Sequence, residues 1–226
     1  MGAATTINMG ANGALFLFDG DPLDSHNGNV LTATGPMDFQ EYKGREYLLL
    51  DGVNSLVAPN DATLDALGDL TISWTMGLLG APVITGTSGL FFYGDTASTS
   101  ATLNCHYGAY GFSTAYSFIY EYNSGTDRIA TLSAIPRSGL GQTLNVWHVT
   151  RSATHTLTYL NGMLVDTYVN AQMPTGGSAD ALTIGALFGG GSPHGPALFG
   201  DFKINPGTAL TAAQVRAEVA QINGWT

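Results

Sequence analysis

The sequence predicts an all-β protein built as an antiparallel sandwich or barrel, and three observations support this. Apolar and polar residues alternate from 70 to 75 (Leu-Thr-Ile-Ser-Trp-Thr), the two-residue period of a strand with one buried face. Between Gly77 and Gly141, clusters of Gly, Ser, Thr and Asp separate apolar runs roughly every 8 to 14 residues, a spacing typical of sandwiches. Asn161-Gly162 lies between two alternating apolar runs, the strongest local signal of a hairpin.

The individual elements follow from the same periods and turn signals. Leu48 to Leu50 run into the turn signal Asp51-Gly52, and a second apolar run follows from Val53 to Val57. The expected strands are 14–18, 30–33, 47–57, 70–76, 89–93, 101–107, 116–122, 128–135, 144–150, 157–160, 163–169, 182–187 and 199–204. Without an internal repeat or a long linker, residues 1–226 are expected to form a single domain.

A single helix is predicted, close to the end of the sequence. Thr211 and Gln214 have the spacing of a capping box, and Asn223-Gly224 is a stop signal. Between them, Val215, Val219 and Ile222 form one apolar stripe at helical spacing. The chain is therefore expected to end in a short amphipathic helix.

The charge composition limits the classes of partner. Charged residues are 11% of the 226 residues, against roughly a quarter on average, and the formal net charge is −10. The chain has two lysines, Lys43 and Lys203, so we expect no cluster of basic side chains that could bind phosphate groups. Nucleic acid and anionic membranes are therefore disfavoured as partners. No run of ~18 apolar residues predicts a transmembrane helix. The sequence lacks the pattern of a signal peptide at Met1, so synthesis in the cytoplasm without a signal is expected.

Cys105 is the one cysteine of the chain, which excludes an intramolecular disulfide. No Lys or Arg flanks it to favour a thiolate. We expect Cys105 to be a small buried apolar residue and not a reactive thiol.

Several segments resemble one family when they are taken in chain order. They are Phe18-Asp19-Gly20, Leu50–Val57, Gly68–Trp74, Trp147–Val149, Tyr159–Val165, Leu182–Gly185, Gly200–Ile204 and Ala209–Val215. The chain resembles the laminin G-like jelly rolls of the concanavalin A-like lectin and glucanase superfamily. The resemblance implies an all-β, two-sheet antiparallel jelly-roll sandwich (concanavalin A-like) with a short C-terminal helix. It also implies that 47–57 and 70–76 are the adjacent second and third strands, with Trp74 in the core.

The family resemblance implies binding of glycans, proteins or cell surfaces, often with calcium at a rim, more than catalysis. Enzymes that resemble this superfamily cleave glucans with two glutamates on one bent strand. The four glutamates here, Glu41, Glu46, Glu121 and Glu218, do not form that motif. Glu41 and Glu46 are five residues apart and would face opposite sides of one regular strand. The five histidines lack the spacing of a zinc site. With neither a glutamate pair nor a zinc site in the sequence, the chain is predicted not to be an enzyme.

Two candidate sites follow from the residue types. Carboxylate and amide oxygens, which Ca²⁺ prefers, gather in one loop, although the same residues also form solvated turns; they are Asp19, Asp21, Asp24, Asn27 and Asn29. Aromatic and histidine side chains in Gly-rich segments are the candidates for an exposed ligand-binding surface; they are Tyr107, Tyr110, Phe112 and His194. A stripe at Tyr116, Phe118, Tyr120 and Tyr122 either belongs to the core or stacks on sugar rings.

The predicted function is a non-catalytic binding or structural module. The low charge and missing disulfides favour an accessory protein of a virion-like assembly, a decoration or tail-associated protein that engages protein and glycan surfaces at the virion surface. One alternative is a free soluble carbohydrate-binding lectin that depends on calcium. The other is a glycoside hydrolase, against which the missing pair of glutamates argues.

Overall fold

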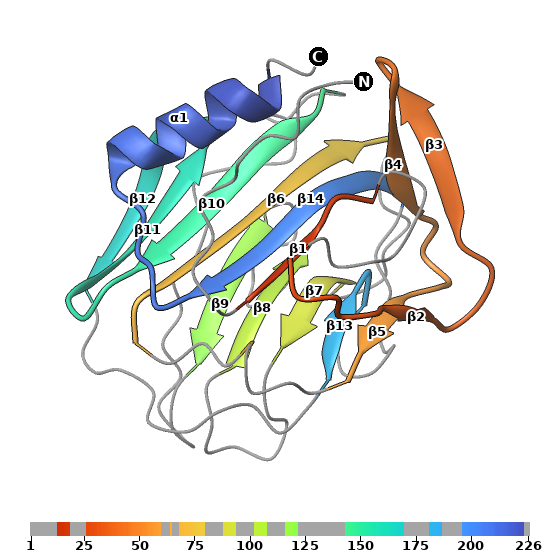
Figure 1. Ribbon diagram of the computed structural model, residues 1–226, viewed down its shortest axis with the longest axis horizontal. Helices are drawn as coiled ribbons and strands as arrows, with labels where there is room; N and C mark the ends of the chain where they lie inside the picture. The colour runs from red at the N-terminus through yellow and green to blue at the C-terminus, as the bar shows by residue number, and fades with distance from the viewer. Residues whose placement is uncertain are drawn as a thin grey trace.

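Two stacked antiparallel sheets form the body of the protein in the computed structural model (Figure 1). The structure describes residues 13–18, 26–59, 64, 68–79, 88–93, 102–107, 116–121, 143–169, 181–186 and 196–223. In three of these ranges it describes the backbone and, of the side chains, that of Cys105; the ranges are 88–93, 102–107 and 116–121. The predicted all-β sandwich with one C-terminal helix is confirmed. The predicted strand 128–135 lies outside the described residues.

The larger sheet has eight strands within the described ranges, in the order β12-β11-β10-β6-β14-β4-β3, with β1 paired to the second half of β14. These strands are β1 (Ala14–Phe16), β3 (Asp38–Tyr42), β4 (Arg45–Leu50), β6 (Leu70–Leu78), β10 (Asn145–Arg151), β11 (His155–Leu160), β12 (Met163–Val169) and β14 (Ala197–Pro206).

The smaller sheet has six described strands, in the order β2-β5-β13-β7-β8-β9. They are β2 (Thr32–Ala33), β5 (Leu56–Ala58), β7 (Ser88–Tyr93), β8 (Thr102–Tyr107), β9 (Tyr116–Glu121) and β13 (Leu182–Ile184). Among the described residues, no helix is long and apolar enough to cross a membrane.

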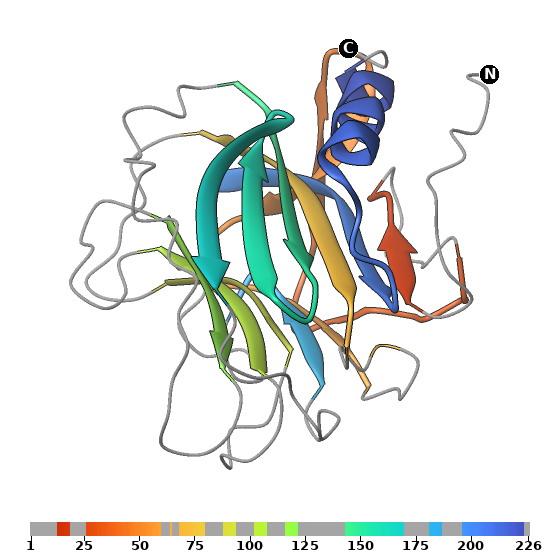
Figure 2. The ribbon, with the colours of Figure 1, turned by 90° about the vertical axis from the view of Figure 1, so that its left-hand side faces the viewer.

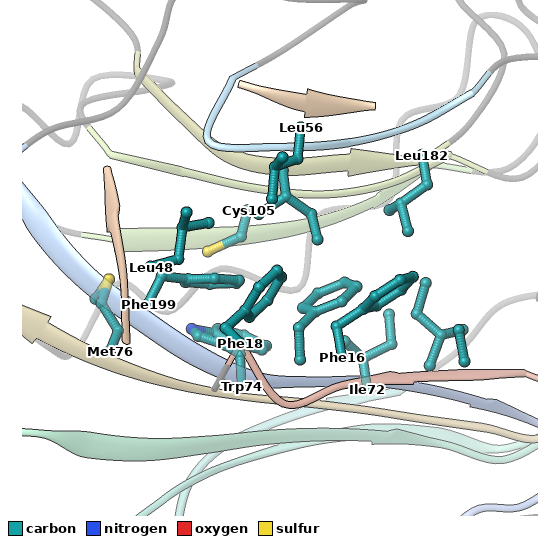
Figure 3. Close-up of a cluster of buried hydrophobic side chains, with 14 of the residues drawn as sticks. Phe16, Phe18, Leu48, Leu56, Ile72, Trp74, Met76, Cys105, Leu182 and Phe199 are labelled. Carbon is teal, nitrogen blue, oxygen red and sulfur yellow. The ribbon is translucent and has the colours of Figure 1, made fainter. Parts of the chain in front are cut away.

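The hydrophobic core lies between the two sheets, as Figure 3 shows. The larger sheet contributes every second residue of β6, among them Ile72 and Trp74, and the smaller sheet contributes Leu56, Leu182 and Cys105. Trp74 is stacked on Trp147 of the neighbouring strand, with ring centroids 5.7 Å apart and an interplanar angle of 5°. The predicted core positions of Trp74 and Cys105 are confirmed. Burial also raises the pKa of the Cys105 thiol far above its ordinary value, so the thiol stays neutral.

The Asp51-Gly52 segment connects the two layers, which corrects the prediction of adjacent strands. β4 belongs to the larger sheet and β5 to the smaller one, and β14 lies between β4 and β6. The Asp51 carboxylate accepts hydrogen bonds from the backbone N–H groups of Val53 (2.8 Å) and Asn54 (2.9 Å), which fixes the turn. Asp51 therefore redirects the chain from one sheet to the other.

Helix α1 (Ala212–Asn223) lies on the face of the larger sheet that points away from the smaller sheet (Figures 1 and 2). The predicted capping box is present, because the Gln214 side chain accepts from the Thr211 backbone N–H at 2.8 Å. The apolar stripe is buried in two small clusters, Val146 with Val219 and Ile222, and Tyr159 with Leu210 and Val215. These clusters position the helix over β10 and β11.

The Asn161-Gly162 hairpin joins β11 to β12 as predicted, with positive φ at both residues (50° and 80°). A Cβ atom on Gly162 would lie 3.2 Å from Cγ of Arg216 in α1. We expect Gly162→Ala to lower the free energy of unfolding by about 2 kcal/mol in urea titrations, since it adds this close contact to the backbone cost. The control is Gly44→Ala, where φ is 78° and no atom lies within 4 Å of the new Cβ.

The control variant isolates the backbone cost, about 1 kcal/mol. Equal losses in the Gly162→Ala and Gly44→Ala variants would show that α1 does not press on the hairpin.

Candidate functional site

The predicted calcium loop is described in part. The Asn27 side-chain amide donates a 2.7 Å hydrogen bond to the carbonyl oxygen of Gly13, which attaches this loop to the residue before β1. Asn29 also lies in the described part, while Asp19, Asp21 and Asp24 lie outside it. No group of three or more His, Cys, Asp or Glu residues in the described ranges is placed to hold a metal ion. Calcium binding by this loop stays a prediction.

The predicted ligand-binding residues lie mostly outside the described ranges. Tyr107 is the last residue of β8, paired with Tyr116 of β9, whereas Tyr110, Phe112 and His194 are not described. Cys105 of β8 enters the core, and its register partner in β9 is Phe118. Whether the aromatic stripe belongs to the core or stacks on sugar rings stays a prediction, because the described side chains do not include it.

A buried ionic centre that the sequence did not predict lies between α1 and the larger sheet. Nζ of Lys203 in β14 donates to both carboxylate oxygens of Glu218 in α1, at 2.7 and 2.6 Å. Nε2 of His148 in β10 lies 3.1 Å from Oε2 of the same carboxylate. The three side chains are 0 to 8% exposed. We call this arrangement the helix–sheet ionic centre.

The sheet register explains how these three groups meet. Lys203 pairs with Ser73 of β6, Ser73 with His148, and His148 with Tyr159 of β11. Directly paired residues project from the same face of a sheet, so these four side chains form a row beneath the helix. Glu218 of the helix contacts both Lys203 and His148, the two residues that flank Ser73 in this row.

Burial and the neighbouring groups together shift all three pKa values. Burial acts to raise the pKa of Glu218, but the hydrogen bond from His148 and the charge of Lys203 outweigh it and hold that pKa below its ordinary value. Burial lowers the pKa of Lys203, against the attraction of Glu218. Burial and the charge of Lys203 lower the pKa of His148 and outweigh the hydrogen bond and charge of Glu218, which raise it. The centre therefore holds a Lys203–Glu218 ion pair beside a neutral imidazole.

A second ion pair, between the partly buried Arg45 of β4 and the buried Asp201 of β14, connects neighbouring strands of the larger sheet. The Arg45 guanidinium donates to both carboxylate oxygens of Asp201, with 2.7 Å for one of them, and to the carbonyl oxygen of Leu17 at 3.1 Å. The Thr75 hydroxyl donates to Asp201 at 3.3 Å. Asp201 has a positive φ of 48° at the irregularity of β14, which turns its carboxylate toward these donors. Both buried carboxylates, Asp201 and Glu218, therefore have strong internal partners.

The sequence argument that separated Glu41 from Glu46 is wrong. The chain turns at Lys43-Gly44, so Glu41 of β3 and Glu46 of β4 lie directly opposite each other across the hairpin. Both are exposed, on the hairpin at the edge of the larger sheet. A general acid of a glycosidase is usually held in an apolar pocket that keeps it protonated, and these two carboxylates lack such surroundings.

Comparison with known proteins finds solved domains of the same fold. No family model and no curated protein sequence matches the chain. Domain 4 of AbnA, an extracellular GH43 arabinanase from Geobacillus stearothermophilus solved with arabinotriose, matches with a TM-score of 0.69 and 17% identity, over 93% of this chain and 100% of that one.

Botulinum neurotoxin domains give the other matches. The binding domain of botulinum neurotoxin DC, solved with rat synaptotagmin II, matches with a TM-score of 0.74 and 11% identity over 97% of this chain and 53% of that one. A structure of botulinum neurotoxin type C, whose cell entry is described as dependent upon interaction with two ganglioside molecules, matches with a TM-score of 0.74 and 12% identity over 98% of this chain and 53% of that one. The chain thus spans about half the length of these neurotoxin domains. At such low identities the similarity establishes the β-sandwich fold.

Proposed function

We propose that the chain is a non-catalytic binding module that recognises glycan or protein surfaces. The observation that carries this proposal is the match to the arabinanase domain over the whole length of that domain, which was solved with an oligosaccharide. A neurotoxin binding domain of the same fold was solved in complex with a protein, rat synaptotagmin II. The shared architecture supports binding as the class of function and leaves the ligand to experiment.

The state of the described carboxylates supports a role without catalysis. Asp201 is held by Arg45, and Glu218 by Lys203 and His148. Glu41 and Glu46 are hydrated on an exposed hairpin. None of these four carboxylates combines an apolar pocket with access to a ligand, which acid catalysis of glycoside hydrolysis requires.

The binding surface that we propose is the one indicated by the sequence. Tyr107, Tyr110, Phe112 and His194 are the proposed ligand contacts. Aromatic side chains suit both sugar rings and protein partners, because they combine apolar area with a polar edge. The loop of Asp19, Asp21, Asp24, Asn27 and Asn29 is the proposed calcium site of a calcium-dependent lectin.

A glycan array with and without a chelator tests this proposal, with arabino-oligosaccharides and ganglioside glycans among the probes. We expect binding to at least one glycan class, at least ten-fold weaker in the Tyr110→Ala variant. The matched control is Val53→Ala, at an exposed apolar position 75% accessible in the turn between the sheets, where binding should be unchanged. A fall with chelator would support the calcium loop. If the protein binds no glycan on the array, glycan recognition is excluded for these probes, and protein binding is the function to test next.

As the finer form of this proposal, the module is an accessory protein on the surface of a virion-like assembly. The low content of charged residues and the lack of disulfides support it. Purified particles should contain the chain in fixed stoichiometry by mass spectrometry, and particles lacking it should differ in surface density or host adsorption by electron microscopy and binding assays. Unchanged particle structure and adsorption would refute this placement.

A further inference from the structure

Helix α1 is held on the larger sheet by few contacts, and the helix–sheet ionic centre lies in their middle. Two small apolar clusters flank the centre, one around Val146 and one around Tyr159. Before the helix, the Thr71 hydroxyl accepts from the Leu210 backbone N–H at 3.0 Å and donates to the carbonyl oxygen of Thr208 at 2.7 Å. The helix is therefore held on the sheet by apolar packing on both sides of the ionic contacts, by these contacts and by the hydrogen bonds of Thr71.

The hydrogen bonds of the centre define the protonation of His148. Its Nε2 atom lies 3.1 Å from Glu218, while its buried Nδ1 atom has no hydrogen-bond partner among the described residues. The arrangement that satisfies Glu218 is a neutral imidazole whose Nε2–H donates to the carboxylate. With Lys203 positive and Glu218 negative, the centre then has no net charge.

A second proton on His148 would find no acceptor in its described surroundings. Glu218 approaches from α1, Lys203 from β14, and Tyr159 from β11 with the charge of Arg216 beside it. The facing residue of β6 is the uncharged Ser73. Within the described residues, the one anion near His148 is Glu218, which already accepts two hydrogen bonds from Lys203.

We propose that the contact of His148 with Glu218 and Lys203 is an acid-sensitive latch, which releases helix α1 from the larger sheet when His148 gains a proton. An imidazolium in the closed state would leave one N–H buried without an acceptor and would give the centre a net positive charge. Both are costly in a site that excludes water. Once the helix has moved away, His148 is hydrated and accepts the proton without this cost.

The sign of the pH dependence follows from the two states. Burial and Lys203 outweigh the opposing effect of Glu218 and hold the pKa of His148 below its ordinary value of 6.5 while the helix is bound. The released state therefore binds the proton more tightly than the closed state. The closed state has its full advantage above pH 6.5 and loses it as the pH falls below that value.

Release of the helix would uncover apolar surface on both partners. On the sheet, Val146 and Tyr159 would become exposed, and on the helix Val215, Val219 and Ile222 would follow. The latch thus couples acidification to the exposure of an apolar surface that is hidden at neutral pH.

Hydrogen–deuterium exchange measured on the whole chain at pH 7.5 and 5.0, corrected for the intrinsic rates, tests the latch. We expect protection of residues 212–223 to fall several-fold, with about 30-fold as the ceiling set by one proton and a pKa of 6.5 in the released state. Protection of the core strand β6 should change far less. A change of less than two-fold in the helix would refute the latch.

Two variants separate His148 from the other histidines. His148→Gln keeps an N–H donor for Glu218 and does not titrate, so protection of its helix should be the same at both pH values. His155→Gln, at the start of β11, should behave like the wild type. A pH response in His148→Gln equal to that of the wild type would overturn the proposal. So would an NMR titration that finds the wild-type His148 pKa above 6.5, which does not depend on any variant folding.

Discussion

Trp74→Ala should lower the free energy of unfolding by about 3–5 kcal/mol, the range for truncating a large buried aromatic side chain. Trp74 is 1% exposed and lies in the centre of β6, where its ring is stacked in parallel on Trp147 of β10. The two residues are direct register partners, so one ring covers the face of the other. The loss therefore combines a cavity with a lost aromatic contact, and urea unfolding followed by circular dichroism measures it.

The contact between the two rings can be isolated by a double-mutant cycle. Trp147→Ala should cost a similar amount, and the double variant should cost less than the sum of the two, because each single variant already removes the shared contact. Trp74→Phe serves as the milder control, since it keeps an aromatic ring on Trp147. Strict additivity, or a loss below about 1 kcal/mol in Trp74→Ala, would contradict the role of this pair.

The elements with strong local signals were predicted correctly from the sequence. The alternation from 70 to 75 marks the inward face of β6, and the Thr211–Gln214 capping box marks the start of α1. Asn161-Gly162 gives the hairpin between β11 and β12. In each case one short segment contains the whole physical cause, whether side-chain period, cap or positive φ.

The sequence did not predict which of the two sheets each strand joins. Leu48 to Leu50 and Leu56 to Val57 are similar apolar runs, yet they lie in opposite layers. The Asp51-Gly52 turn signals a change of direction without telling whether the chain stays in its sheet. Glu41 and Glu46 show the same limit, since a turn at Lys43-Gly44 was not foreseen and brings them together across a hairpin.

Part of the helix–sheet ionic centre has a signal in the sequence. Glu218 interrupts the apolar stripe of α1, at the i+3 position after Val215 and one residue before Val219, so its burial follows from helical spacing. A buried carboxylate needs a cation, and Lys203 is one of two lysines and stands between Phe202 and Ile204 in its strand. The place of His148 depends on the pairing of β10 with β6 and of β6 with β14, which the sequence alone does not give.

Lys203→Met should lower the free energy of unfolding by about 3–5 kcal/mol at pH 7.5, the cost of leaving a buried carboxylate without its counter-ion. Glu218 would keep only the weaker contact with His148. Since Lys203 is one of the groups that hold the pKa of Glu218 low, that pKa should rise in the variant. The difference in the free energy of unfolding between wild type and variant should therefore narrow as the pH falls toward 4.5. The reason is that Glu218 gains its proton at a higher pH in the variant than in the wild type.

The double variant Lys203→Met/Glu218→Gln tests whether the charge is the cause. The amide oxygen that replaces the carboxylate would still accept the hydrogen bond from His148 without a charge in the buried site, so at least half of the lost stability should return. Glu218→Gln alone leaves Lys203 buried without an anion and should cost about as much as Lys203→Met. If the double variant is as unstable as the two single losses added together, the helix depends on packing at this point and not on the ion pair.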